Sequence, residues 1–248
     1  MTIVIDELKS AFIAYRKQPF LFAWGSFMYL FLFVVSIFAA FAIILAYFIF
    51  LSVMGIQFDL TSPITIGVAS IALLLFMLFT NGLNAALSKT YSSAMDKERM
   101  SLTAFYAYAL KKAPPMFTIM LFRDILWLVA VLPAIALYVF VLDETIYAQI
   151  LIGGYALAAT FVIHLLFTPA FIYSGAVGIG IFSAIRHSIT AFRKKHIQFI
   201  GLYVLFAVVW LLNFIPFIQL ATIFFAYPII YSAMISMLEG AVKLERED

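Results

Sequence analysis

Five polar side chains interrupt stretches of the chain that are otherwise apolar: Asn81, Asn84, Arg123, Asp124 and His164. Inside a membrane, such groups bind an ion or a polar solute, or they join neighbouring helices by hydrogen bonds. Counting from the expected helix ends places all five at a similar depth in the inner half of the membrane. We therefore predict one polar pocket that opens towards the cytoplasm, with interhelical hydrogen bonding as the alternative role.

Arg123 and Asp124 are chain neighbours, and neighbouring residues on a helix point about 100° apart. We therefore expect that the two side chains do not face one another and that each needs a partner on another helix. Arg123 lies seven residues past Met116, where the apolar segment starts. At 1.5 Å per residue this is a depth of roughly 10 Å, from which a guanidinium reaches the cytoplasmic surface.

No arrangement of residues predicts an enzyme. The chain contains no cysteine, and its three histidines, His164, His187 and His196, lack the spacing of metal ligands. No acid, base and nucleophile of plausible spacing can be named. We expect no catalytic residue, no metal and no other cofactor.

The composition is that of an integral membrane protein. Hydrophobic residues make up 66% of the 248 residues and charged residues only 11%, which leaves too little polar surface for a soluble globule of this size. The net charge of +3 is small, and the basic residues cluster beside apolar segments. This pattern favours phospholipid headgroups over nucleic acid as the partner.

The elements that must position the polar residues are apolar segments, because a helix crosses the hydrocarbon core with about 20 apolar residues. Six segments qualify or nearly do, at 20–54, 64–87, 116–142, 146–174, 197–212 and 217–238. The fifth has only 16 residues. We predict an all-α integral membrane protein, a single membrane domain over 1–248, with six transmembrane helices paired as three helical hairpins.

A short amphipathic helix is predicted before each hairpin, at about 2–18, 101–113 and 181–193. In each, apolar residues share one face and charged residues the other. Pro19 separates the first from its hairpin, and Pro114 and Pro115 are expected to end the second.

Two signatures indicate internal repetition. AYRK, ALKK and AFRK occur at 14–17, 109–112 and 191–194, and Tyr-Ser dipeptides begin at Tyr91, Tyr173 and Tyr231. Tyr91 precedes Lys112 by 21 positions, and Tyr173 precedes Lys194 by the same number. We predict repeats at about 1–95, 96–177 and 178–242 with a charged tail at 243–248, the alternative being coincidence in a sequence rich in Ala, Tyr and Ser.

Charge distribution predicts the orientation. Fourteen of the 15 basic residues lie in the termini or between hairpins, whereas the predicted tips carry Asp59, Asp143 and Glu144. The positive-inside rule then places both termini and all three amphipathic helices in the cytoplasm of a multi-pass protein of the cell membrane. The residues expected to contact lipid headgroups are Arg16, Lys17, Lys111, Lys112, Arg193, Lys194 and Lys195.

The repeated pattern, an amphipathic helix that ends in a basic pair and leads into a hairpin, resembles a group of polytopic membrane families. These include the membrane domain attached to some glycerophosphoryl diester phosphodiesterases and related archaeal and bacterial proteins of unknown function. The resemblance covers nearly the whole chain and carries no catalytic residue over. It implies a membrane module without a known reaction.

Two functions remain open. The first is a non-enzymatic membrane module whose basic amphipathic helices bind anionic lipids of the inner leaflet or recruit a membrane or cytoplasmic protein partner. The second is a transporter or lipid translocator with its substrate in the polar inner-half pocket. Each predicted repeat starts inside and contains two spans, which is parallel topology and favours the module over inverted-repeat alternating access.

Overall fold

The structure is a computed structural model that describes residues 2–56, 59, 61–140 and 146–247. The predicted acidic turn at Asp143 and Glu144 lies outside this part, as do the side chains of the charged tail at 243–248. The helices of the described part are α1 Thr2–Lys17, α2 Pro19–Val53, α3 Pro63–Met95, α4 Leu102–Phe140, α5 Ile146–Val177, α6 Ile181–Leu212, α7 Pro216–Ala221, the π-helix η1 Thr222–Ala226 and α8 Tyr227–Glu247.

Within the described residues, six helical stretches are long and apolar enough to cross a membrane, and they correspond to the six predicted segments. The sixth runs through α7, η1 and α8 as one span, Phe217–Gly240. The described residues contain no strand. The predicted class, an all-α polytopic membrane protein with six helices of membrane-spanning length and hydropathy among the described residues, is confirmed.

The sequence predicts a break in the helix between each amphipathic segment and the span that follows it. The structure has such a break at two of the three places. Gln18 has a non-helical backbone between α1 and α2, and Lys195 forms a kink inside α6 with φ −135° and ψ 42°. The expected break at Pro114 and Pro115 is wrong, because α4 continues through both prolines.

Packing explains why α4 stays continuous. Ala109, Ala113, Met116 and Ile119 are buried at spacings of four, three and three residues, on one face that runs past the prolines. Proline removes a backbone donor and crowds the preceding turn, but burial of this face on both sides of the prolines keeps the axis continuous.

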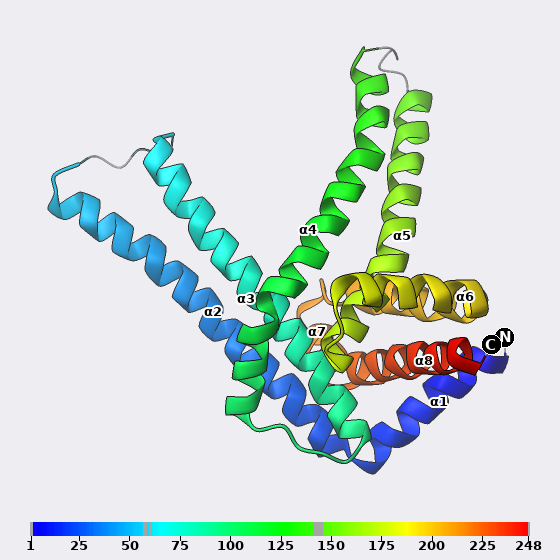
Figure 1. Ribbon diagram of the computed structural model, residues 1–248. Coiled ribbons are helices and arrows are strands. Elements are labelled where there is room, and N and C mark those ends of the chain that lie inside the picture. The colour runs from blue at the N-terminus through cyan, green and yellow to red at the C-terminus, as the bar shows by residue number, and fades with distance from the viewer. Residues whose placement is uncertain (1, 57–58, 60, 141–145, 248) are drawn as a thin grey trace.

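The three hairpins are arranged unequally. The α2/α3 pair and the α4/α5 pair diverge from one another, and we call these two pairs the arms (Figure 1). We call the region where the arms meet, together with α1, α6 and α8, the base. Helices α6 and α8 run across it. Helix α1 packs along α8, and α3 contacts α2, α4, α5 and α8. Helix α3 is therefore the element around which the base is assembled.

Small residues let the helices of the base approach closely. A Cβ added at Gly82 of α3 would lie 2.2 Å from the carbonyl oxygen of Ala109 on α4. A Cβ added at Gly175 of α5 would lie 2.9 Å from the Cα of Ala85 on α3. Such contacts are typical of membrane helices, whose association depends on close van der Waals packing.

The core lies in the base, and the arms are exposed. Phe22, Tyr91 and Phe199, from three different helices, have no more than 1% of their surface exposed. On the α2 arm Phe38 is 70% exposed, and on the α4 arm Val129 is 65% exposed. Large apolar side chains of this exposure need hydrocarbon around them.

Candidate functional site

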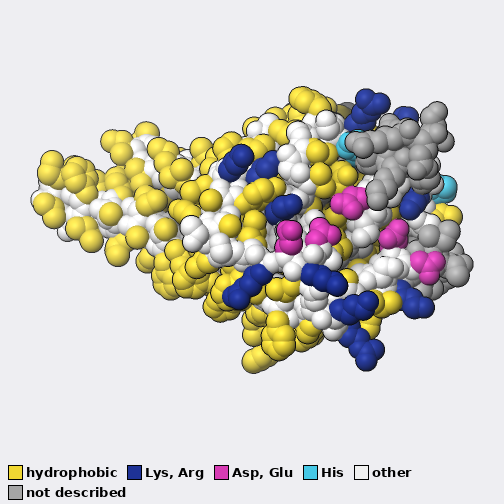
Figure 2. Space-filling model, turned by 60° about the horizontal axis from the view of Figure 1, so that its bottom comes forward, with side chains coloured by type: hydrophobic (Ala, Val, Ile, Leu, Met, Phe, Trp, Pro, Cys, Tyr) yellow, Lys and Arg dark blue, Asp and Glu magenta, His cyan; other side chains and the backbone are white. Residues whose placement is uncertain are grey.

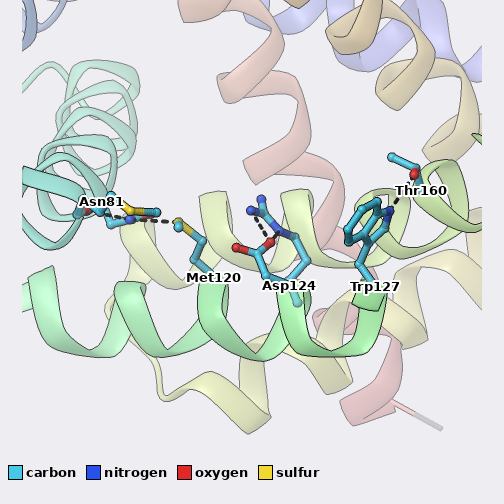
Figure 3. A network of polar contacts seen from close by, with 7 residues as sticks. Asn81, Met120, Asp124, Trp127 and Thr160 are labelled. Carbon is cyan, nitrogen blue, oxygen red and sulfur yellow. Dashed lines mark hydrogen bonds and ion pairs between the residues drawn. The ribbon is translucent and has the colours of Figure 1, made fainter. Parts of the chain in front are cut away.

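The predicted polar residues of α3 form hydrogen bonds to their own helix. Asn81 donates from Nδ2 to the carbonyl of Met77 at 2.7 Å and to Sδ of Met120 on α4 at 3.1 Å (Figure 3). Asn84 donates to the carbonyl of Thr80 at 3.0 Å. Asn81 thus links α3 to α4, whereas the hydrogen bond from Asn84 to Thr80 stays within α3.

Arg123 and Asp124 bind one another, contrary to the prediction from their adjacency. Nε of Arg123 lies 2.8 Å from Oδ1 of Asp124, and Nη2 lies 2.7 Å from the same oxygen (Figure 3). The long arginine side chain curls around the helix, so the 100° between their Cα–Cβ directions does not prevent contact. The side chains remain 27% and 45% exposed.

His164 of α5 is close enough to Arg123 and Asp124 to interact electrostatically with both. Tyr203 of α6 is likewise within electrostatic range of Arg123. The structure therefore brings three of the five predicted residues together, and Asn81 of α3 contacts Met120, about one turn before Asp124 on α4. The prediction of one pocket lined by all five stays a prediction.

A row of polar contacts along α4 includes residues that sequence reasoning missed. Met120 accepts from Asn81 on one side, and Trp127 donates from Nε1 to Oγ1 of Thr160 on α5 at 2.7 Å (Figure 3). Asp124 stands between them, at spacings of four and three residues that define one helix face. This helical spacing in the sequence could have indicated that the three residues share one face of α4. The row joins α4 to both of its neighbours.

The predicted headgroup contacts fall into two groups. Lys112 donates to the carbonyl of Gly178 at 2.8 Å, and Lys195 lies 3.6 Å from the Glu7 carboxylate. These two cations are therefore engaged within the chain. The side chains of the other five are exposed: Arg16, Lys17, Lys111, Arg193 and Lys194.

Figure 2 shows where cations gather. On the face in view, dark blue Lys and Arg side chains surround the base, interspersed with acidic ones, and the arm projecting from it is covered by hydrophobic side chains. On this face the exposed cations thus gather on the base, whereas exposed apolar side chains cover the arm. Exposed apolar side chains also occur on the base, as at Phe182 and Phe217.

The Tyr-Ser signature lies in the core of the base. The rings of Tyr91 and Tyr231 meet edge to face with centroids 5.8 Å apart, and Tyr173 belongs to the same core cluster. Ser26 of α2 accepts from or donates to Tyr91 at 2.8 Å and donates to the carbonyl of Ile223 in η1 at 2.8 Å. The signature residues therefore serve packing between hairpins, and Ser26 had no distinguishing signal in the sequence.

Helix α1 is fastened to the same core. The hydroxyl of Tyr15 donates to the carbonyl of Phe224 in η1 at 3.2 Å, and its ring packs on Phe22 with centroids 5.6 Å apart. Burial raises the pKa of Tyr15 above its usual value of 10.0, so this hydroxyl keeps its proton. Helix α1, which covers the first predicted amphipathic segment, is thus held against the base.

A cavity of about 310 Å³ lies between α1 and the end of α3. Its polar lining comes from Ser10, Lys17, Gln18 and Lys97, and its apolar lining includes Ile13 and Met95. None of the five predicted pocket residues lines it. One predicted headgroup contact, Lys17, lines this cavity. Lys97 also lines it, although no sequence pattern had indicated Lys97.

Comparison with known proteins shows no match to a family model, to a curated protein or to a solved structure. The resemblance to the membrane domain of glycerophosphoryl diester phosphodiesterases therefore stays a prediction.

Proposed function

We propose that this polytopic membrane protein is a non-enzymatic module whose charged base lies at the cytoplasmic surface of the membrane and binds anionic lipid headgroups. The observation that carries the proposal is that exposed Lys and Arg side chains gather on the base, whereas the arm in view is covered by apolar side chains (Figure 2).

The arms position the base. Two hairpins of exposed apolar helices stand in the hydrocarbon core, and the base from which they diverge then lies at the level of the headgroups (Figure 1). Cations held there interact with an anionic leaflet with about 1 kcal/mol for each Lys or Arg near the surface. Arg16, Lys111 and Arg193 are exposed and come from three different helices, so their contributions spread over the base.

The transport hypothesis has less support from the polar residues that suggested it. The charges of Arg123 and Asp124 compensate one another across 2.7 Å. Asn81 and Trp127 form hydrogen bonds that join helices. These contacts match interhelical hydrogen bonding, the alternative role of such residues in membranes.

Lipid selection in nanodiscs tests the proposal. The purified protein is reconstituted in equal amounts of phosphatidylglycerol and phosphatidylcholine, extracted gently, and its retained lipids are counted by native mass spectrometry. The wild-type protein is expected to retain phosphatidylglycerol preferentially. The triple variant Arg16→Gln, Lys111→Gln, Arg193→Gln is expected to lose most of this preference.

A charge-conserving triple variant, Arg16→Lys, Lys111→Arg, Arg193→Lys, is the matched control, and it is expected to retain the preference. Equal retention of the two lipids by the wild-type protein contradicts the proposal. Preference that survives in the Gln variant would assign the selectivity to other residues and refute the role of these three.

A further inference from the structure

Lys97 adopts a backbone conformation that favours glycine. It follows the C-terminal end of α3 with φ +66°, and no other non-glycine residue of the described chain has a positive φ. The amide of Lys97 donates to the carbonyl of Ala94, and the amide of Glu98 donates to the carbonyl of Ser93. This is the Schellman arrangement that ends many helices, in which glycine usually occupies the left-handed position.

A lysine at this position is strained, because its Cβ crowds the backbone in the left-handed region. Strain that a fold retains at a single position is a reason to ask what the side chain does. The Lys97 side chain lines the cavity of about 310 Å³ between α1 and α3. Lys17, at the end of α1, lines the same cavity. One cation from the end of α1 and one from the turn after α3 therefore line the same open pocket.

The rest of the lining is suited to an amphiphile. Ile13, Ala14, Ala94 and Met95 supply apolar surface. Gln18 lines the cavity too, and its Oε1 is buried with no hydrogen-bond partner among the described residues. An unpaired buried amide oxygen is costly, and because it only accepts, a hydroxyl group of a ligand headgroup, not a phosphate oxygen, is the group that would satisfy it.

The segment after Lys97 is held in place from α2. Nε1 of Trp24 donates to the carbonyl of Met100 at 3.0 Å, and the Arg99 guanidinium lies 4.7 Å from the centre of the Trp24 ring. These contacts order the turn that carries Lys97, which reduces the entropic cost of binding a ligand there. The flanking Asp96 and Glu98 are exposed and do not line the cavity.

We propose that Lys17 and Lys97 form a specific site for the phosphodiester of one anionic lipid, whose apolar part lies along Ile13 and Met95. The site rests on the proposed function, since it needs the base to lie at the headgroup layer. It is more specific than the proposed function, because it assigns one lipid molecule to one cavity. It also explains why Lys97 keeps a strained backbone conformation: the side chain is needed for binding.

Titration of the detergent-solubilised full-length protein with dihexanoyl phosphatidylglycerol tests this site. Loss of one charge-assisted contact is expected to weaken binding about tenfold or more in Lys97→Gln and in Lys97→Gly. Lys97→Gly is at the same time expected to melt at a higher temperature than the wild-type protein, because glycine relieves the strain at φ +66°. Lys9→Gln removes one charge from an exposed position of α1 outside the cavity lining and is expected to bind as wild type does.

Two further probes identify the source of the phosphate. Dihexanoyl phosphatidylcholine carries the same chains and phosphodiester without net charge and is expected to bind more weakly. Glycerol phosphate carries no chains, and if it binds as tightly as the lipid, a soluble phosphate ester is the ligand and the lipid assignment is wrong.

Unchanged phosphatidylglycerol binding in Lys97→Gly would show that the lysine is incidental and would overturn the site. If Lys97→Gln binds normally but the triple Gln variant of the exposed cations loses lipid selection, only this site fails. If Lys97→Gln loses one bound lipid and the triple variant keeps its selection, only the proposed distributed function fails.

Discussion

The hydroxyl of Tyr91 on α3 donates a hydrogen bond to Oγ of Ser26 on α2, 2.8 Å away. The direction follows from Ser26, whose hydroxyl lies 2.8 Å from the carbonyl oxygen of Ile223 and 3.3 Å from that of Phe22. Because carbonyls only accept, we assign the single Ser26 proton to the shorter of these two bonds. A relay from Tyr91 through Ser26 to Ile223 therefore joins the first hairpin to the third in the core of the base.

Replacing Ser26 by Ala is expected to lower the free energy of unfolding by about 1–3 kcal/mol, because the buried Tyr91 hydroxyl and the Ile223 carbonyl both lose their partner. Tyr91→Phe leaves only Ser26 without its donor and should cost less, about 1 kcal/mol. Denaturant titration in mixed micelles measures both. Ser36→Ala is the control, because Ser36 on the same helix bonds only to the nearby Phe33 carbonyl. Equal effects at Ser26 and Ser36 would refute the relay.

Gly82→Ala is expected to disrupt the contact between α3 and α4. The new Cβ would lie 2.2 Å from the Ala109 carbonyl oxygen, a backbone atom that cannot rotate away. Overpacking of this kind costs about 1–3 kcal/mol or more. Gly67→Ala on the same helix faces open space and is expected to be neutral or slightly stabilising. Thermal unfolding in detergent compares the two, and similar melting temperatures would contradict the close approach.

The pairing of Arg123 with Asp124 predicts non-additive substitutions. Asp124→Asn leaves an uncompensated cation on an apolar helix and is expected to destabilise the protein more than the double variant Arg123→Gln, Asp124→Asn does. A double-mutant cycle on the free energy of unfolding should give a coupling of about 0.5–3 kcal/mol. Additive effects would mean that each side chain has its own partner on another helix, as the sequence pattern had indicated.

The stability of the turn before α3 is expected to depend on pH. The backbone amide and hydroxyl of Thr61 both donate to Oδ1 of Asp59, at 2.8 and 2.7 Å, and these bonds hold the pKa of Asp59 below its usual 3.8. A depressed folded-state pKa means that the turn is fully stabilised above the unfolded value and loses this contribution as the pH falls through the folded value. NMR titration of the Asp59 carboxyl is expected to give a pKa below 3.8, rising in Thr61→Val. A value at or above 3.8 in the wild-type protein would exclude these bonds.

Much of the fold follows from residue patterns, because the bilayer demands long apolar helices and leaves few alternatives. The six apolar helices are of this kind, and α2 and α3 start at Pro19 and Pro63, one residue before the predicted starts at 20 and 64. The continuity of α4 through Pro114 and Pro115 is not, since it depends on which face packs against another helix. The crossing of α6 and α8 over the base likewise depends on contacts between distant segments (Figure 1).

For the candidate sites, the sequence indicates which residue types are unusual but not which contacts they make. Hydropathy identifies Arg123 and Asp124 as unusual, but their mutual bond depends on side-chain torsions that spacing does not determine. Lys97 stands in a charged stretch where nothing distinguishes it, and its left-handed backbone becomes evident only in three dimensions. The internal repeats stay a prediction, although two of the Tyr-Ser tyrosines, Tyr91 and Tyr231, pack on each other.

The most direct test of the account is an electron cryomicroscopy map of the protein in nanodiscs of phosphatidylglycerol. We expect both apolar arms to stand in the hydrocarbon layer, the base to lie at one headgroup layer, and phosphate density to contact the exposed cations of the base. Ordered lipid elsewhere around the protein, with the basic side chains of the base facing water and no phosphate beside them, would contradict the proposed function.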